Sequence, residues 1–234
     1  MSGTLYLIGT GPGDPELLTL KAARVLSALD GVAYPQKPGA TSQSLTIAET
    51  HLSDSVEHFA FDVPMAVDRG PAQAAYDQMA EQLAPKLAAG QNIGYLCEGD
   101  PLFYGSAMYL LHRLPDAQIE IIPGITSLTA AAAEIKRPLA ARNERLKILP
   151  APLESAALEA ELAASEAVAL IKIGRHFDRV RDALNKTGHG ERAMVVEYAT
   201  RDTQKITKLA EYPQGERPYF SIILSYKGDE AWGS

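Results

Sequence analysis

The sequence predicts an α/β protein made of two α/β domains, and three observations support this fold class. Short apolar runs that read as buried strands recur along the chain. Stretches with the apolar spacing of helices lie between them, and such alternation predicts mostly parallel sheets covered by helices. The 234 residues are enough for one large or two small domains with a sizeable core.

The first half of the chain alternates regularly between strands and helices. A strand at 4–8 ends in glycines, a helix follows over 17–26, and a strand returns at 31–34. The next expected elements are a helix at 45–51, a strand at 56–61, a helix at 71–89, a strand at 92–96, a helix at 105–113, a strand at 118–122 and a helix at 127–134. Pro71 suits the first turn of the long helix, and Gly90 suits its end.

The periodicity is lost over residues 135–143, and we place a domain boundary there, near residue 140. The expected domains are 1–140, which carries the glycine loops, and 141–234. The second domain is expected to contain strands at 146–149, 167–173, 193–198, 204–206 and 220–224, and helices over 158–163 and 180–184. Strands that follow one another without room for a helix favour a mixed sheet in this domain.

Composition narrows the class of protein. No apolar run reaches the roughly 18 residues of a membrane span, and no signal-peptide pattern is evident, so we expect no membrane partner. The single cysteine, Cys97, cannot form an internal disulfide, so a cytoplasmic location is expected. The net charge of -7 argues against a nucleic-acid partner. No residue spacing typical of a metal site or a catalytic triad is recognised, so no metal is expected.

The most informative segment is the acid loop, residues 97–105, with the sequence Cys-Glu-Gly-Asp-Pro-Leu-Phe-Tyr-Gly. It follows the expected strand at 92–96, and ligands of open α/β sheets bind at the carboxyl ends of strands. Two carboxylates at such a place are costly unless they have partners or a cationic ligand. The alternative interpretation is a solvated turn in which Asp100 caps the next helix.

Two further glycine loops follow expected strands. Residues 9–16 suggest a dinucleotide-binding fingerprint, but Asp14 replaces its third glycine and Pro12 removes one N–H from the phosphate cradle. We therefore favour a tight turn that lets the backbone approach a bulky ligand, with a plain turn capped by Asp14 as the alternative. Residues 123–127 carry a hydroxyl pair that can cap a helix or donate to a ligand. Three such loops at three strand ends predict a shared pocket.

Two segments are locally basic in this acidic chain. The first comprises Lys136, Arg137, Arg142, Arg145 and Lys147, and the second comprises Arg175, His176, Arg179 and Arg181. Arginine matches carboxylates bidentately, so both segments could face a polycarboxylate substrate. The alternative is that both are solvated surfaces.

These loops give the chain a resemblance to the tetrapyrrole methylases of the cobalamin pathway, a family that uses S-adenosylmethionine. The resemblance covers nearly the whole chain and rests on residues 9–14, 98–101 and 123–127. A closer resemblance, to members that methylate carbon 20 of precorrin-2, rests on residues 97–108, 143–146 and 172–177, and relatives that act elsewhere usually carry glycine in place of Glu98. The resemblance implies two α/β domains with the cofactor folded into a cleft between them, a homodimer, and a tetrapyrrole substrate.

Carried over residue by residue, the resemblance also implies a site. The residues expected to line S-adenosylmethionine are Pro12, Glu98, Gly99, Asp100, Phe103, Thr126, Ser127, Ile173 and Ala199. Some relatives have methionine in place of Ile173 and glycine in place of Ala199. The candidate catalytic residues are Asp100, as a catalytic or cofactor-orienting carboxylate, and the substrate-side hydroxyls of Tyr34 and Tyr104. Arg145 and Arg175 are expected to bind substrate carboxylates.

The implied chemistry needs no enzyme nucleophile, because the methyl group on a sulfonium is already activated. The protein must hold the methyl group in line with an electron-rich carbon, exclude water and manage a proton. Four other functions stay open: an NAD-type oxidoreductase, a non-catalytic tetrapyrrole or nucleoside binding protein, a methylase of another ring position, and a methylase of RNA or protein. The acidic charge speaks against RNA. Metal-free precorrin-2 and its cobalt-loaded counterpart both stay open as substrates.

Overall fold

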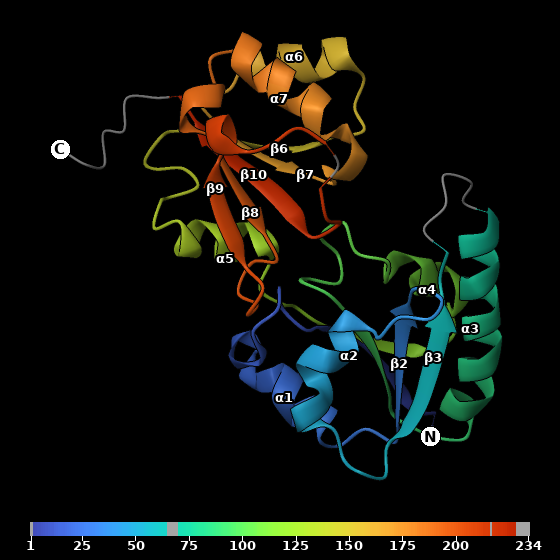
Figure 1. The fold of residues 1–234 in the computed structure, drawn as a ribbon. Helices are drawn as coiled ribbons and strands as arrows, with labels where there is room; N and C mark the ends of the chain where they lie inside the picture. Colours follow the sequence, from blue (N-terminus) through green and yellow to red (C-terminus); the bar gives the residue numbers. More distant parts are fainter. Residues whose placement is uncertain (1, 65–69, 216, 228–234) are drawn as a thin grey trace. The chain divides into compact units, whose positions relative to one another are not determined.

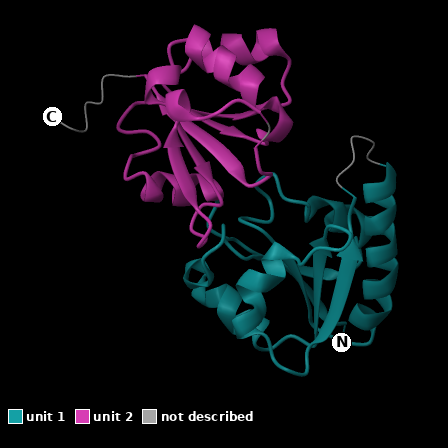
Figure 2. Cartoon of the chain, viewed as in Figure 1, with its two compact units in different colours: residues 1–126 teal, residues 127–234 magenta. Residues whose placement is uncertain are grey.

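The computed structural model describes residues 2–64, 70–215 and 217–227. The chain divides into two compact units, unit 1 at Met1–Thr126 and unit 2 at Ser127–Ser234 (Figure 2). Each unit contains its own five-stranded sheet with helices. The predicted α/β class with two sheets is therefore confirmed.

Unit 1 contains a fully parallel sheet with the strand order β3-β2-β4-β1-β5. Figure 1 shows two of these strands, β2 and β3, side by side. Its strands are β1 (Thr4–Gly9), β2 (Gly31–Gln36), β3 (Glu57–Asp62), β4 (Ile93–Cys97) and β5 (Gln118–Ile122). Its helices are α1 (Leu20–Leu26), α2 (Gln43–Ala48), α3 (Gly70–Ala88) and α4 (Met108–Arg113), with 3₁₀-helices at Pro15–Leu17 and Glu49–His51.

Helices cover both faces of this sheet because side chains alternate along its central strands. Leu5 and Leu7 of β1 join the core formed with α3 and α4. Ile8 joins the core on the other face, together with Leu26 of α1. A parallel sheet buried on both faces needs such near-continuous apolar strands, which is why the strands could be recognised from the sequence.

Unit 2 contains a mixed sheet, as predicted, and its strand order is β6-β7-β10-β8-β9. Its strands are β6 (Leu146–Pro150), β7 (Ala167–Ile171), β8 (Met194–Glu197), β9 (Lys205–Lys208) and β10 (Ser221–Tyr226). Its helices are α5 (Ser127–Glu134), α6 (Ser155–Ala163) and α7 (Phe177–Lys186), with 3₁₀-helices at Gly174–His176, Gly190–Arg192 and Leu209–Glu211. Strands β6 and β7 are parallel, whereas β10 runs antiparallel to both β7 and β8.

Several expected boundaries differ from the structure, and two of them bear on the site. The division between units falls after Thr126, earlier than the expected boundary near residue 140, because α5 packs against β10 of the second sheet. The helix expected at 105–113 begins only at Met108, because the acid loop continues through Ser106. Among the described residues, no helix is long and apolar enough to span a membrane.

Candidate functional site

The three glycine loops meet in unit 1, because they leave the carboxyl ends of three neighbouring strands, β4, β1 and β5. The N–H of Gly99 donates to the carbonyl of Gly11 at 2.8 Å, and the N–H of Gly11 donates to that of Gly99 at 3.3 Å. The N–H of Thr10 donates to the carbonyl of Cys97 at 2.8 Å. The acid loop is thus joined to the first glycine loop by backbone hydrogen bonds.

Only glycine fits at the centre of this junction. A Cβ atom at Gly124 would lie 2.1 Å from the carbonyl oxygen of Gly99, and one at Gly9 would lie 2.6 Å from the Cα of Gly124. Gly11 and Gly99 also have φ of +80° and +67°, which side chains disfavour. The structure therefore brings the three loops together as the sequence indicated, and the shared pocket stays a prediction.

Asp100 uses one carboxylate oxygen within the acid loop and the other to bond the glycine loop at 123–127. Oδ1 accepts from the N–H of Leu102 at 2.9 Å, and Oδ2 accepts from the N–H of Gly124 at 3.1 Å. The alternative role as a cap of α4 is wrong, because that helix starts at Met108 and has no side-chain cap. A carboxylate engaged in this way is suited to orienting the loops.

The rest of the acid loop is tightly folded. Tyr104 has φ of 55°, a conformation that non-glycine residues rarely adopt, and its ring is 5.1 Å from that of Phe103 in an edge-on contact. A Cβ atom at Gly105 would lie 2.5 Å from the carbonyl oxygen of Pro101. Strained residues persist only where their surroundings hold them, and they cluster at functional sites.

Next to the loop, a partly buried hydrogen bond joins two side chains, and the sequence analysis missed it. The hydroxyl of Tyr95 in β4 lies 2.7 Å from Oγ of Ser106, where the loop ends. The available signal was a tyrosine in an otherwise aliphatic buried strand, since a buried tyrosine hydroxyl needs a partner. Nearby, burial raises the pKa of Cys97 far above its usual range, so this thiol stays protonated and acts as a small apolar residue.

Tyr34 differs from the other candidates in its surroundings. It is buried in β2, and its hydroxyl lies 3.4 Å from Nδ1 of His58 on the edge strand β3. Burial raises the pKa of Tyr34, so its hydroxyl stays protonated at neutral pH and can donate a hydrogen bond. This histidine lies on β3, whereas the three glycine loops leave β4, β1 and β5.

The expected site residues divide between the units. Pro12, Glu98, Gly99, Asp100, Phe103 and Thr126 lie in unit 1, and Ser127, Ile173 and Ala199 lie in unit 2. Ile173 and Ala199 are buried and follow the carboxyl ends of β7 and β8. Both neighbour non-glycine residues with positive φ, namely Lys172 at 57°, Tyr198 at 50° and Thr200 at 66°. Unit 2 therefore has strained turns at the strand ends where its candidates lie.

Several side chains of the two basic segments bond to other groups of unit 2. Arg179 donates to the carbonyls of Leu153 and Ala151, and Lys147 pairs with Glu161 at 2.6 Å. Arg181 donates to two carbonyls at 2.7 Å each, so its guanidinium also holds the backbone. Partial burial and two neighbouring arginines lower the pKa of His176, which favours its neutral form.

Arg145 and Arg175, the two arginines expected to bind substrate, are exposed. The backbone N–H of Arg145 donates to the carboxylate of Glu166 at 3.4 Å. Nε of Arg175 donates to Nε2 of His176 at 3.5 Å. Their role toward a ligand stays a prediction.

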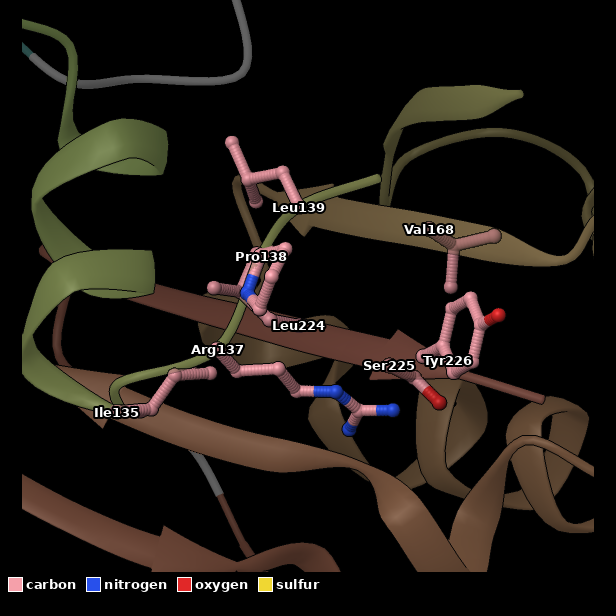
Figure 3. A pocket seen from close by; sticks show the side chains of 8 residues that line it. All are labelled: Ile135, Arg137, Pro138, Leu139, Val168, Leu224, Ser225 and Tyr226. Carbon is pink, nitrogen blue, oxygen red and sulfur yellow. The ribbon is translucent and has the colours of Figure 1, made fainter. Parts of the chain in front are cut away.

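Arg137 of the first basic segment lines a small pocket in unit 2 (Figure 3). Its walls include Ile135, Val168, Leu224 and Tyr226, and the guanidinium of Arg137 lies 5.0 Å from the Tyr226 ring centroid. Its volume of about 10 Å³ has room for about one water molecule, far less than typical ligand pockets offer. We therefore do not assign a ligand to it. In the described ranges, no group of three or more His, Cys, Asp or Glu side chains could hold a metal ion.

Comparisons with known proteins agree with the resemblance. The family model "Tetrapyrrole (Corrin/Porphyrin) Methylases" matches residues 4–212. A precorrin-2 C(20)-methyltransferase from a Sinorhizobium species is 37% identical over 231 residues, which cover 95% of this chain and 94% of that protein. A cobalt-precorrin-2 C(20)-methyltransferase from Salmonella typhimurium is 31% identical, covering 97% and 98%.

Two further similarities bear on length and fold. The cobalamin biosynthesis protein CobIJ of Mycobacterium tuberculosis is 38% identical over 95% of this chain, and the chain spans about half of that protein, 46%. The structure of uroporphyrin-III C-methyl transferase from Thermus thermophilus, complexed with S-adenyl homocysteine, has a TM-score of 0.70 at 22% identity. The similarity covers 96% of this chain and 92% of that one, which shows a shared fold. This chain belongs to the tetrapyrrole (corrin/porphyrin) methylase family.

Proposed function

We propose that this chain is an S-adenosylmethionine-dependent methyltransferase that methylates carbon 20 of precorrin-2 or of its cobalt-loaded counterpart. The observation that carries the proposal is the acid loop, which Asp100 ties to the glycine loop at 123–126. This junction lies at the strand ends where α/β proteins bind ligands. Full-length relatives that carry the C(20)-methyltransferase name support the ring position.

The residues at the junction fit a bulky ligand such as S-adenosylmethionine. Gly9 and Gly124 fill the centre of the junction, but a Cβ at Gly99 would have only one neighbour within 4 Å, the carbonyl oxygen of Ile125 at 3.9 Å. The backbone of the acid loop is therefore approachable at Gly99. We propose that all nine expected residues, in unit 1 and in unit 2, contact the cofactor.

When bound, S-adenosylmethionine supplies an activated methyl group. In this proposal Asp100 fixes the acid loop, so the backbone around Gly99 is held in place before binding and little ordering is needed. The hydroxyl of Tyr104, a residue exposed in the acid loop, is the candidate for a hydrogen bond to the substrate. Tyr34 is kept as a second, donating hydroxyl, because its pKa is raised.

Apolar side chains beside the acid loop suit one face of a macrocycle. Leu102, Tyr104 and Met108 are 57%, 46% and 46% exposed. Exposed apolar groups that gather in one place often mark a binding surface. We propose that they contact the ring of the tetrapyrrole, while Arg145 and Arg175 meet its carboxylates.

The NAD-type alternative is weakened by the first glycine loop. Asp14 accepts from the N–H of Glu16 at 2.8 Å and starts a 3₁₀-helix at Pro15–Leu17. Helix α1 begins only at Leu20, capped by Thr19. A dinucleotide fingerprint instead leads directly into a helix whose N-terminus faces the pyrophosphate.

The proposal is tested by incubating the enzyme and S-adenosylmethionine separately with precorrin-2 and with its cobalt-loaded counterpart. Mass spectrometry should show one added methyl group on at least one of them. Calorimetry should show S-adenosylhomocysteine binding. No binding at millimolar ligand would refute the cofactor proposal. Binding without methyl transfer to either tetrapyrrole would refute the substrate proposal.

We also propose a cytoplasmic homodimer. The lone cysteine and the family resemblance support this assembly and location. Light scattering coupled to size-exclusion chromatography should give twice the mass of one chain, whereas a single-chain mass would contradict the dimer.

A further inference from the structure

The turn after β8 contains two strained residues on either side of one candidate. Tyr198 and Thr200 have φ of 50° and 66°, and Ala199 between them is buried. Positive φ is most unusual for a β-branched residue such as Thr200. Such a turn persists only if surrounding contacts hold it.

The first strained residue is held by the backbone and by an aromatic contact. The N–H of Tyr198 donates to the carbonyl of Phe220 at 2.8 Å. The guanidinium of Arg201 lies 4.2 Å from the Phe220 ring centroid and 5.8 Å from that of Tyr198. These contacts restrain Tyr198, and a different residue restrains Thr200.

Gln204 supplies that hold with both ends of its amide. Oε1 accepts from the N–H of Thr200 at 2.6 Å, and Nε2 donates to Oε2 of Glu134 at 2.6 Å. The backbone N–H of Gln204 also donates to the carbonyl of Arg201 at 2.8 Å. Because Glu134 is the last residue of α5, Gln204 connects the strained turn to a helix of the same unit.

We propose that Gln204 is a positioning residue that keeps Thr200 in its left-handed conformation and so presents the backbone around Ala199 to S-adenosylmethionine. Glu134 in turn orients the amide of Gln204, since its carboxylate can only accept and therefore fixes which end is Nε2. The inference rests on the proposed function, in which Ala199 contacts the cofactor.

A charge exchange between the two side chains tests this role. In Gln204→Glu the new carboxylate faces that of Glu134, so the affinity for S-adenosylhomocysteine, measured by calorimetry, should fall by about two- to tenfold. Glu134→Gln removes the carboxylate that orients the amide of Gln204, so its affinity should lie between that of the wild type and that of Gln204→Glu. The double variant Gln204→Glu/Glu134→Gln should regain wild-type affinity, because an amide again donates to a carboxylate. The exposed Gln214→Glu makes the same chemical change in the same unit and should have no effect.

Thermal unfolding of each variant separates positioning from general stability. The inference expects the affinity to follow the charge pairing at position 204, with rescue in the double variant. It is overturned if Gln204→Glu lowers only the melting temperature and leaves the affinity unchanged. It is also overturned if the double variant stays as weak as Gln204→Glu. Absence of binding by the wild type would instead refute the proposed function.

Discussion

Replacing Asp100 by alanine should loosen the junction of the glycine loops. The carboxylate accepts two backbone N–H groups, from Leu102 at 2.9 Å and from Gly124 at 3.1 Å. Hydrogen bonds to charged groups contribute about 1.5–3 kcal/mol each. Asp100 is half-buried and solvent competes for its partners, so we expect Asp100→Ala to cost about 2–4 kcal/mol in total.

The same loss should appear in cofactor binding. If the freed loop must be ordered again when the ligand binds, the affinity for S-adenosylhomocysteine should fall at least tenfold, about 1.4 kcal/mol. Asp100→Asn keeps one acceptor oxygen and should fall between alanine and the wild type. Glu98→Gly should be milder than Asp100→Ala, since relatives acting on other ring positions usually carry glycine there.

Urea denaturation and calorimetry with S-adenosylhomocysteine measure the two effects on each variant. Asp116→Ala, at an exposed aspartate in the same unit, is the matched control and should change stability by less than about 0.5 kcal/mol. Wild-type stability and affinity in Asp100→Ala would refute the reasoning.

Three other changes have defined outcomes. Gly124→Ala places a Cβ 2.1 Å from a carbonyl oxygen of the acid loop, so urea denaturation should show a loss of about 3 kcal/mol or more, and a milder loss would mean that the loops can separate. Arg145→Ala and Arg175→Ala should each raise the KM for the tetrapyrrole, and added salt should also raise it. The affinity for S-adenosylhomocysteine, measured by calorimetry, should stay constant. An unchanged KM in both variants would mean that these arginines only form a solvated surface. Burial lowers the pKa of His189, so the folded state binds fewer protons at this residue than the unfolded state does. The free energy of unfolding should therefore fall as the pH drops below about 6.5. His189→Gln should reduce this pH dependence of stability.

The fold could be predicted largely because local patterns fix its elements. The buried parallel strands of unit 1 are continuous apolar runs, and the mixed sheet of unit 2 was indicated by strands such as β8 and β9 with no helix between them. The boundary was harder to predict, because α5 follows the unit 1 pattern of strand then helix. Its packing on β10 is a contact with a strand nearly a hundred residues later.

The meeting of the three glycine loops could be predicted from the sequence, but the side-chain hydrogen bonds that hold them could not. Strand ends and glycines located the three loops. The role of Asp100 depends on Gly124, 24 residues away in sequence, and that of Gln204 depends on Glu134. The strain at Thr200 gives no sequence signal, since threonine is common in ordinary turns and strands.

The most direct test of the central claim is the position of the methyl group that the enzyme transfers. The tetrapyrrole product formed with S-adenosylmethionine carrying an isotope-labelled methyl group can be examined by nuclear magnetic resonance. The account predicts one labelled methyl group, bonded to carbon 20 of the macrocycle. A label on any other ring carbon, or an unlabelled tetrapyrrole recovered after incubation with an enzyme that binds S-adenosylhomocysteine, would contradict it.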